Sequence, residues 1–196
     1  MYSSDNPKKG PKETSKDHQA SGRASSPVRR IVMMSLLTAM GLALSAVEST
    51  FPPLLPFPGV KLGLANIVTL IGFSLLNRKR VCLLVCLRLI LASFVLGSFA
   101  TPGFWISCTG GLLSLCSMAL CVGLPSLSIV GLSLAGAAFH NLGQILAVLF
   151  LLGNRGILYY LPWLLLWSIP MGLFTGFAAK AALSALAKTG HALMDE

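Results

Sequence analysis

The chain has 196 residues, of which 55% are hydrophobic and only 11% charged, and its formal net charge is +9. Soluble domains carry about 25% charged residues, so this composition excludes a water-soluble globular protein. The cations lie beside apolar segments, where they act as topology signals and attract anionic lipid headgroups. We therefore expect an all-α membrane protein in contact with the lipid bilayer, without a nucleic-acid partner.

The first 30 residues differ in composition from the rest of the chain. They hold ten charged side chains, are rich in Ser, Pro, Gly and Lys, and contain few apolar residues. Such a segment cannot bury enough surface to offset the entropy lost on ordering. We expect a disordered, basic cytoplasmic tail over residues 1–30, a membrane domain over residues 31–187 and a short cytoplasmic tail over residues 188–196.

Six apolar stretches follow the tail, each close to the 20 or so helical residues that span the hydrocarbon of a bilayer. Charged or Pro/Gly-rich interruptions separate them at residues 31–47, 60–76, 81–99, 104–122, 127–152 and 157–186. We predict a bundle of six transmembrane helices; a cleaved signal peptide is the alternative for the first stretch. With six alternating helices only Lys61 and Arg155 oppose the other cations, so both termini are expected in the cytoplasm, at a bacterial inner membrane.

The segment between the first two stretches, residues 49–59, contains four prolines. Each proline removes a backbone N–H and restricts the residue before it, so the segment cannot be helical. Exposed irregular backbone is not tolerated in lipid, so the segment must lie against protein or at the interface. Two interpretations remain open, an extracytoplasmic lid over a binding pocket and a rigid connector anchored at the headgroups.

Polar side chains within the apolar stretches are candidates for a binding site, because an ionisable group in hydrocarbon costs roughly 2.5 to 3.5 kcal/mol on insertion scales. Arg88 lies about 12 Å from the predicted cytoplasmic end, too deep to reach the interface, and should point inward toward an anion. Helix-end carbonyls are its alternative partners. The predicted substrate-binding residues are Glu48, Lys61, Asn66, Arg88, His140, Asn141 and Gln144.

Some of these residues are expected to lie together, in one case with Arg155. Glu48, Lys61 and Arg155 are expected in the outer half of the membrane, where they would line one outward-facing vestibule. On the fifth stretch, His140 and Gln144 share one helical face, with Asn141 displaced by about 100 degrees. The alternative to ligand contact there is hydrogen bonding between helices.

Other residues argue against catalysis and indicate packing. Glu48 is the only carboxylate between Asp17 and Asp195, and the chain has no phosphate-binding loop, nucleophile motif or metal-ligand cluster. We therefore expect no catalytic residue, no metal and no cofactor. Small residues recur every four positions at Ser35, Ala39 and Ala43 and at Gly131 and Ala135, a spacing that lets helices approach closely; we interpret these stripes as packing within the bundle.

Longer motifs indicate a family. The runs GLALSAVESTFPPLLPFPGVKLGLANIVTL, SLAGAAFHNLGQILAVLFLLGNRGILYYLPWLLL and GLFTGFAAK resemble the bacterial membrane family labelled Gx transporter, which is also labelled heptaprenyl diphosphate synthase component I. The resemblance covers about residues 30–186. Members are similar to the S components of energy-coupling factor transporters, six-helix proteins that bind vitamins or related micronutrients outside the cell.

The resemblance implies partners as well as a fold. In those transporters a separate membrane coupling subunit and two cytoplasmic ATPases supply the energy, and the stripe at Ala39 and Ala43 would face the coupling subunit. The main expectation is a solute-binding subunit for uptake of a small micronutrient or precursor, energised by these separate subunits.

The family's second label implies an alternative. It is a noncatalytic membrane component associated with heptaprenyl diphosphate synthase in prenyl-quinone biosynthesis, with a prenyl synthase subunit as partner. Prenyl synthases use aspartate-rich Mg²⁺-diphosphate motifs on a soluble helical fold, and this sequence has none of them. An accessory role is then the most that the label implies. A structural membrane scaffold is a third possibility.

Overall fold

The structure, a computed structural model, describes residues 27–50, 63–124 and 126–192. Within these ranges the chain forms helices and no strand. The helices are α1 (Pro27–Thr50), α2 (Leu64–Leu75), α3 (Arg78–Val95), α4 (Pro102–Cys121), α5 (Ile129–Leu152), the short 3-10 helix η1 (Arg155–Tyr160) and α6 (Leu161–Ala192). The predicted all-α membrane bundle of six helices is thereby confirmed.

Local chemistry explains where several helices begin and end. Helix α1 begins at Pro27, whose fixed φ suits the first turn of a helix. Before α5, the Ser128 hydroxyl accepts a hydrogen bond from the Gly131 N–H at 3.1 Å. Gly153 then ends α5 in the left-handed conformation, with φ +64°. Helix α6 continues to Ala192, so residues 27–30 and 188–192, which were expected in the tails, belong to helices.

Four helical stretches are long and apolar enough to cross a membrane, namely Val28–Thr50, Pro102–Cys121, Ile129–Leu152 and Arg155–Lys188. Helix α2 has 12 residues, about 18 Å at 1.5 Å per residue, whereas the hydrocarbon is about 30 Å thick. The predicted second span, residues 60–76, begins before Gly63, which precedes α2 in the left-handed conformation, and its residues 60–62 lie outside the described residues. Helix α2 forms the buried centre of the bundle, where Val68 and Leu70 are almost inaccessible.

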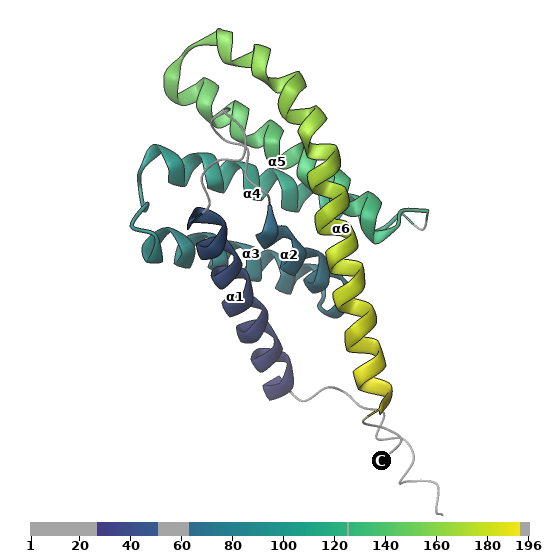
Figure 1. Ribbon diagram of the computed structural model, residues 1–196. Helices are drawn as coiled ribbons and strands as arrows, with labels where there is room; N and C mark the ends of the chain where they lie inside the picture. The colour runs from purple at the N-terminus through teal and green to yellow at the C-terminus, as the bar shows by residue number, and fades with distance from the viewer. Residues whose placement is uncertain (1–26, 51–62, 125, 193–196) are drawn as a thin grey trace, which may run out of the picture.

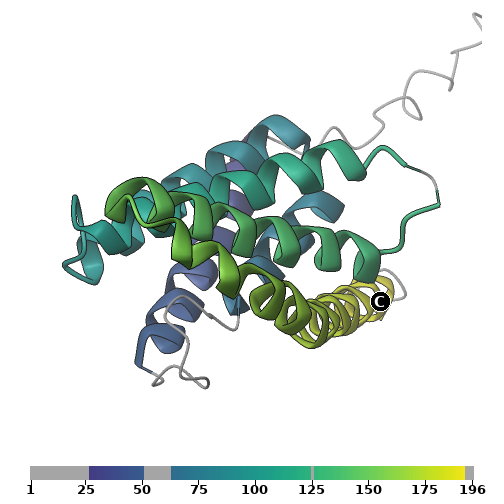
Figure 2. The ribbon, with the colours of Figure 1, turned by 90° about the horizontal axis from the view of Figure 1, so that it is seen from above.

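Helix α5 lies between α4 and α6, as the views in Figures 1 and 2 show. The backbones of α4 and α5 are in direct contact, because a Cβ atom on Gly143 would lie 2.7 Å from the Thr109 carbonyl oxygen and 2.8 Å from the Gly110 Cα. Glycine is required at this approach, since any side chain would push the helices apart.

Helix α6 packs against the other side of α5 by the same means. A Cβ atom on Gly172 would lie 3.0 Å from the Leu134 Cα, and one on Gly176 would lie 2.9 Å from the Val130 Cα. Next to Gly176, the hydroxyls of Ser133 and Thr175 form a hydrogen bond of 2.8 Å. Small residues and one buried polar pair therefore hold this helix pair together.

Three segments lie together at one end of the bundle, namely the start of α1, the α2–α3 turn and the second half of α6. Leu76 and Val81, on either side of the turn, belong to one apolar cluster with Ala179 of α6, and Met33 of α1 packs against it. Figure 1 shows the start of α1 and the end of α6 at the same end of the molecule. The cations that begin α3, residues 78–80, lie at this end too. We call it the cationic end.

Candidate functional site

A cavity of about 320 Å³ lies between the ends of four helices. Its walls come from the C-terminal end of α1, the N-terminal end of α2, the α3–α4 turn with its flanking helices, and the middle of α5. Four of the predicted binding residues line it, namely Glu48, Asn66, Arg88 and His140. The volume is at the lower end of the roughly 300 to 1,000 Å³ typical of small-molecule sites.

The cavity has a buried floor and an exposed rim. Asn66, Arg88 and Ser93 are buried at the floor, whereas Ser49 and Leu96 are exposed at the rim. Helices α1 and α3 both begin at the cationic end and reach the cavity near their C-terminal ends. The cavity therefore opens at the end of α1 and α3 opposite to the cationic end.

Arg88 is the central feature of the floor. Its side chain is 5% exposed, and its Nε and Nη1 atoms are buried without a hydrogen-bond partner among the described residues. The stem fits because position 41 is glycine, where a Cβ atom would lie 2.9 Å from the Arg88 Cδ. A buried guanidinium with unused donors is costly, so the arrangement is one that an anionic group would stabilise.

Glu48 joins two helix ends at the entrance. Its Oε1 accepts a hydrogen bond of 2.6 Å from the backbone N–H of Gly63, which precedes α2 in the left-handed conformation with φ +72°. A carboxylate at a helix N-terminus also interacts favourably with the helix dipole. The negative charge of Glu48 attracts the Arg88 guanidinium as well. Glu48 thus positions the start of α2 beside Arg88.

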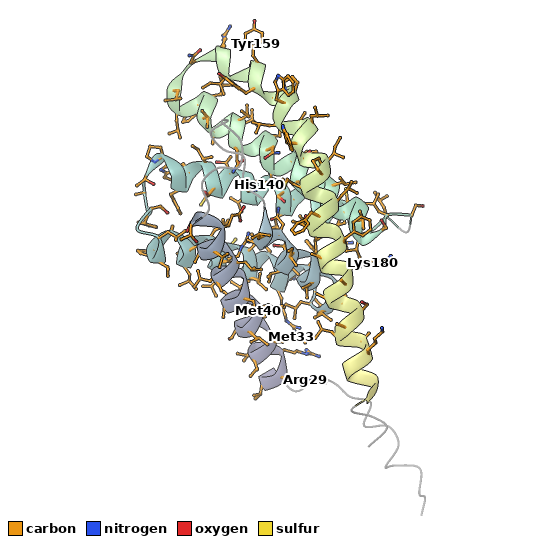
Figure 3. All side chains as sticks on the ribbon, viewed as in Figure 1. Arg29, Met33, Met40, His140, Tyr159 and Lys180 are labelled. Atoms are coloured by element: carbon orange, nitrogen blue, oxygen red, sulfur yellow. The ribbon has the colours of Figure 1, made fainter. Side chains whose placement is uncertain are left out.

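The three predicted residues of α5 separate in space. His140 lines the cavity and lies toward the middle of the molecule in Figure 3. Gln144 lies one turn further along, 2% exposed and packed against Gly110 of α4, and its amide atoms have no hydrogen-bond partner within the described chain. Asn141 faces α6, where its Nδ2 donates to the Leu164 carbonyl oxygen at 2.9 Å. The structure therefore places Asn141 in a contact between helices.

The structure describes only part of the outward-facing vestibule expected from Glu48, Lys61 and Arg155. Lys61 and residues 51–59 of the Pro-rich segment lie outside the described residues, while Ser49 and Thr50 end α1. Arg155 does not reach the cavity but lines a separate hollow with Phe150 and Leu158. The reason is the length of α5, which continues 12 residues past His140, about 18 Å. Figure 3 shows Tyr159, close to Arg155, at the opposite end of the molecule from Arg29.

Sequence reasoning missed several small polar residues of the lining. Ser45 lies one turn before Glu48, and Ser93 follows Arg88 by five positions on the same helix. Their hydroxyls donate within their own helices, to Gly41 at 2.9 Å and to Ile90 at 2.6 Å, so the hydroxyl oxygens retain capacity to accept from a ligand. The helical period traced back from Glu48 is the signal that would have found Ser45, whereas Ser93 lies about 140 degrees around the helix from Arg88 and carries no such signal.

The small-residue stripe of α1 has a different environment from the one expected. Ser35, Ala39 and Ala43 are all exposed on the outside of the bundle. The interpretation of this stripe as packing within the bundle is therefore wrong, because α1 turns its other face, with Leu37 and Gly41, toward the core. The stripe leaves a flat surface on α1 that another helix can approach closely.

The sequence matches one family of known proteins over a range that includes this site. The sequence profile of the family described as heptaprenyl diphosphate synthase component I matches residues 37–182. Comparison with curated proteins and with solved structures gives no match. The matched range begins within α1, ends within α6 and includes every described residue that lines the cavity. The chain belongs to the heptaprenyl diphosphate synthase component I family.

Proposed function

We propose that this protein is a noncatalytic membrane component whose cavity binds the anionic group of a small molecule. The observation that carries the proposal is Arg88, a buried guanidinium at the cavity floor with two nitrogen atoms that lack partners among the described residues. A carboxylate or phosphate would supply charge-assisted hydrogen bonds to these donors. Asn66 and the lining serines would orient the rest of the molecule.

The family name supports a role beside heptaprenyl diphosphate synthase. The ligand would then be an isoprenoid diphosphate, and this chain would hold it in the membrane for a separate synthase subunit. Between Asp17 and Asp195 this chain has one carboxylate, Glu48. Mg²⁺-dependent diphosphate chemistry, which uses several carboxylate oxygens, would therefore belong to the partner.

A second role, as a solute-binding subunit for uptake, has support from the position of the cavity. The positive-inside rule would direct the cationic end, and with it both termini, toward the cytoplasm of a bacterial inner membrane. The cavity would then open outward, as in the S components of energy-coupling factor transporters. The exposed stripe of Ser35, Ala39 and Ala43 would offer a membrane coupling subunit a surface for close helix contact.

The shared part of both roles is tested by identifying bound molecules. The protein is purified in mild detergent and its copurifying small molecules are measured by mass spectrometry, together with Arg88→Ala and Arg155→Ala. We expect an anionic molecule that Arg88→Ala loses and that Arg155→Ala retains, because Arg155 is an exposed arginine away from the cavity. Equal occupancy in the wild-type protein and Arg88→Ala would contradict the proposal.

The two roles are separated by the proteins that accompany the chain. Affinity purification from native membranes is expected to recover a soluble prenyl synthase subunit if the first role is correct. Recovery of a membrane coupling subunit with paired ATPases would instead favour uptake. The chemical identity of the bound anion, isoprenoid or not, gives an independent answer.

A further inference from the structure

An apolar groove of about 430 Å³ lies between the start of α4 and the end of α5, apart from the cavity. Among the described residues that line it, Thr109 alone carries a hydroxyl, and the others are aliphatic or aromatic. Its walls are formed by Trp105, Thr109, Leu146, Ala147, Phe150 and Leu151. Phe150 is 90% exposed and Trp105 is 55% exposed, so the groove faces outward from the bundle, toward the hydrocarbon of a membrane.

Two neighbouring aromatic residues in contact with each other line this groove and the cavity. Phe104 lines the cavity and Trp105 lines the groove, and their ring centroids are 5.4 Å apart in an edge-to-face arrangement. The ring centroid of Phe99 lies 5.1 Å from that of Phe104, and the Phe99 ring is itself stacked on Phe94 at 4.4 Å. Such ring pairs are favourable beyond the apolar area that they bury. The contacting rings of Phe104 and Trp105 therefore form a wall that the polar cavity and the apolar groove share.

The volumes of the cavity and of the groove suit two different parts of one ligand. At about 30 Å³ per atom, the volume of a water molecule in the liquid, the 320 Å³ cavity holds roughly ten non-hydrogen atoms. That is enough for a charged head and too little for a long chain. By the same measure, the 430 Å³ groove holds roughly fourteen more atoms in apolar surroundings. A molecule with an anionic head and a hydrocarbon chain would fill both spaces.

We propose that the α4–α5 groove binds the hydrocarbon chain of an isoprenoid diphosphate whose head lies at Arg88. The inference rests on the proposed function, since it takes the anion at Arg88 as given and adds the part of the molecule that lies beyond the cavity. An isoprenoid chain is the occupant that the family name favours. Methyl-branched hydrocarbon would also bury apolar area against the exposed rings of Trp105 and Phe150.

The test compares a molecule that has both parts with one that has only the head. Farnesyl diphosphate and inorganic diphosphate are titrated onto the full chain in phosphatidylcholine nanodiscs. Leu151→Trp fills the groove, and Leu152→Trp is the matched control, because Leu152 is 68% exposed and does not line the groove. We expect Leu151→Trp to lower the affinity for farnesyl diphosphate about tenfold, which is the effect of losing the burial of one or two methylenes. Inorganic diphosphate should bind unchanged, and Leu152→Trp should bind both as the wild type does.

Trp105→Ala is a second variant, which removes part of the groove wall without adding bulk. It should lower the affinity for farnesyl diphosphate and leave the affinity for inorganic diphosphate unchanged. The inference is overturned if both groove variants bind farnesyl diphosphate as tightly as the wild type. It is also overturned if native mass spectrometry shows that Leu151→Trp displaces retained phospholipid with no change for farnesyl diphosphate, since the groove would then hold membrane lipid.

Failure of the inference and failure of the proposed function give different results. If neither diphosphate binds but another anion copurifies in an Arg88-dependent manner, the chain-binding groove is wrong and the anion site stands. If no Arg88-dependent ligand of any kind is found, both proposals are wrong.

Discussion

Two nitrogen atoms of Arg88 are buried beside the cavity without partners among the described residues, and the Glu48 carboxylate is held by the Gly63 N–H. An unsatisfied buried donor costs about 1 to 3 kcal/mol. A side chain retained under such conditions lowers stability unless something else binds to it. Arg88 therefore lowers the stability of the ligand-free protein, while its unused donors favour ligand binding.

Replacement of this side chain by an apolar one of similar length separates the effect of Arg88 on stability from its effect on ligand binding. We expect Arg88→Met to raise the free energy of unfolding of the ligand-free protein by about 1 to 3 kcal/mol, because it removes a buried charge and unused donors. The same variant should show no stabilisation by ligand. Thermal unfolding in detergent measures both, with exposed Lys79→Met as the control on the same helix. A lower melting temperature for Arg88→Met would show that the guanidinium holds the helices together.

Individual residues of the site were predictable to different degrees. Arg88 was predicted to point inward because its depth excludes the interface, an argument that needs no neighbouring helix. The helical period correctly placed Asn141 about 100 degrees from His140. It does not say which helix covers each face, so the contact of Asn141 with Leu164 and the packing of Gln144 against Gly110 were beyond the sequence.

Pairs of helices in this bundle approach through glycine. The contact of α5 with α6 uses Gly172 and Gly176, whose four-residue spacing is visible in the sequence. The contact of α4 with α5 uses Gly110 and Gly143, which lie far apart in the chain and carry no local signal. Small-residue spacing alone did not distinguish Gly172 and Gly176 from the exposed stripe of α1, because the pairing of helix surfaces depends on the tertiary arrangement.

The α4–α5 contact provides a prediction at the level of the helix pair. Gly143→Ala would place a Cβ atom 2.7 Å from the Thr109 carbonyl oxygen, and backbone cannot yield as a flexible side chain does. We expect a loss of about 1 to 3 kcal/mol in the free energy of unfolding, the usual cost of overpacking. Gly72→Ala is the control, since its Cβ would meet Val81 at an ordinary 3.5 Å. It should be neutral or stabilising by up to about 1 kcal/mol, as Ala favours helix. Equal unfolding curves for both variants would contradict the prediction.

Across the whole molecule, apolar length was the most informative property of the sequence. It predicted the six α-helices and their approximate positions, because each helix must shield its backbone polar groups from lipid. It did not predict that the second helix is buried, since an apolar run does not reveal whether a helix crosses lipid or is enclosed by other helices. The buried Val68 and Leu70 show that α2 is enclosed.

The placement of cations at one end leads to a prediction of topology. In a variant whose five native cysteines are replaced by serine, we introduce Thr101→Cys at the exposed α3–α4 turn or Lys79→Cys at the cationic end. A membrane-impermeant maleimide added to intact cells should label Thr101→Cys, because the positive-inside rule directs Lys79 toward the cytoplasm. Lys79→Cys should react only after permeabilisation, and the reverse pattern would place the cavity on the cytoplasmic side.

Helix α1 carries two surfaces on a single rigid element. Ser45 and Glu48 face the cavity, while Ser35, Ala39 and Ala43 form its exposed flank. A protein that docks on this flank and rotates α1 would alter the affinity of the cavity for its ligand. Thermodynamic reciprocity then requires the ligand to change the affinity for that protein by the same factor. Ligand binding in the cavity would thus affect binding at the outer surface of the bundle through the movement of α1 alone.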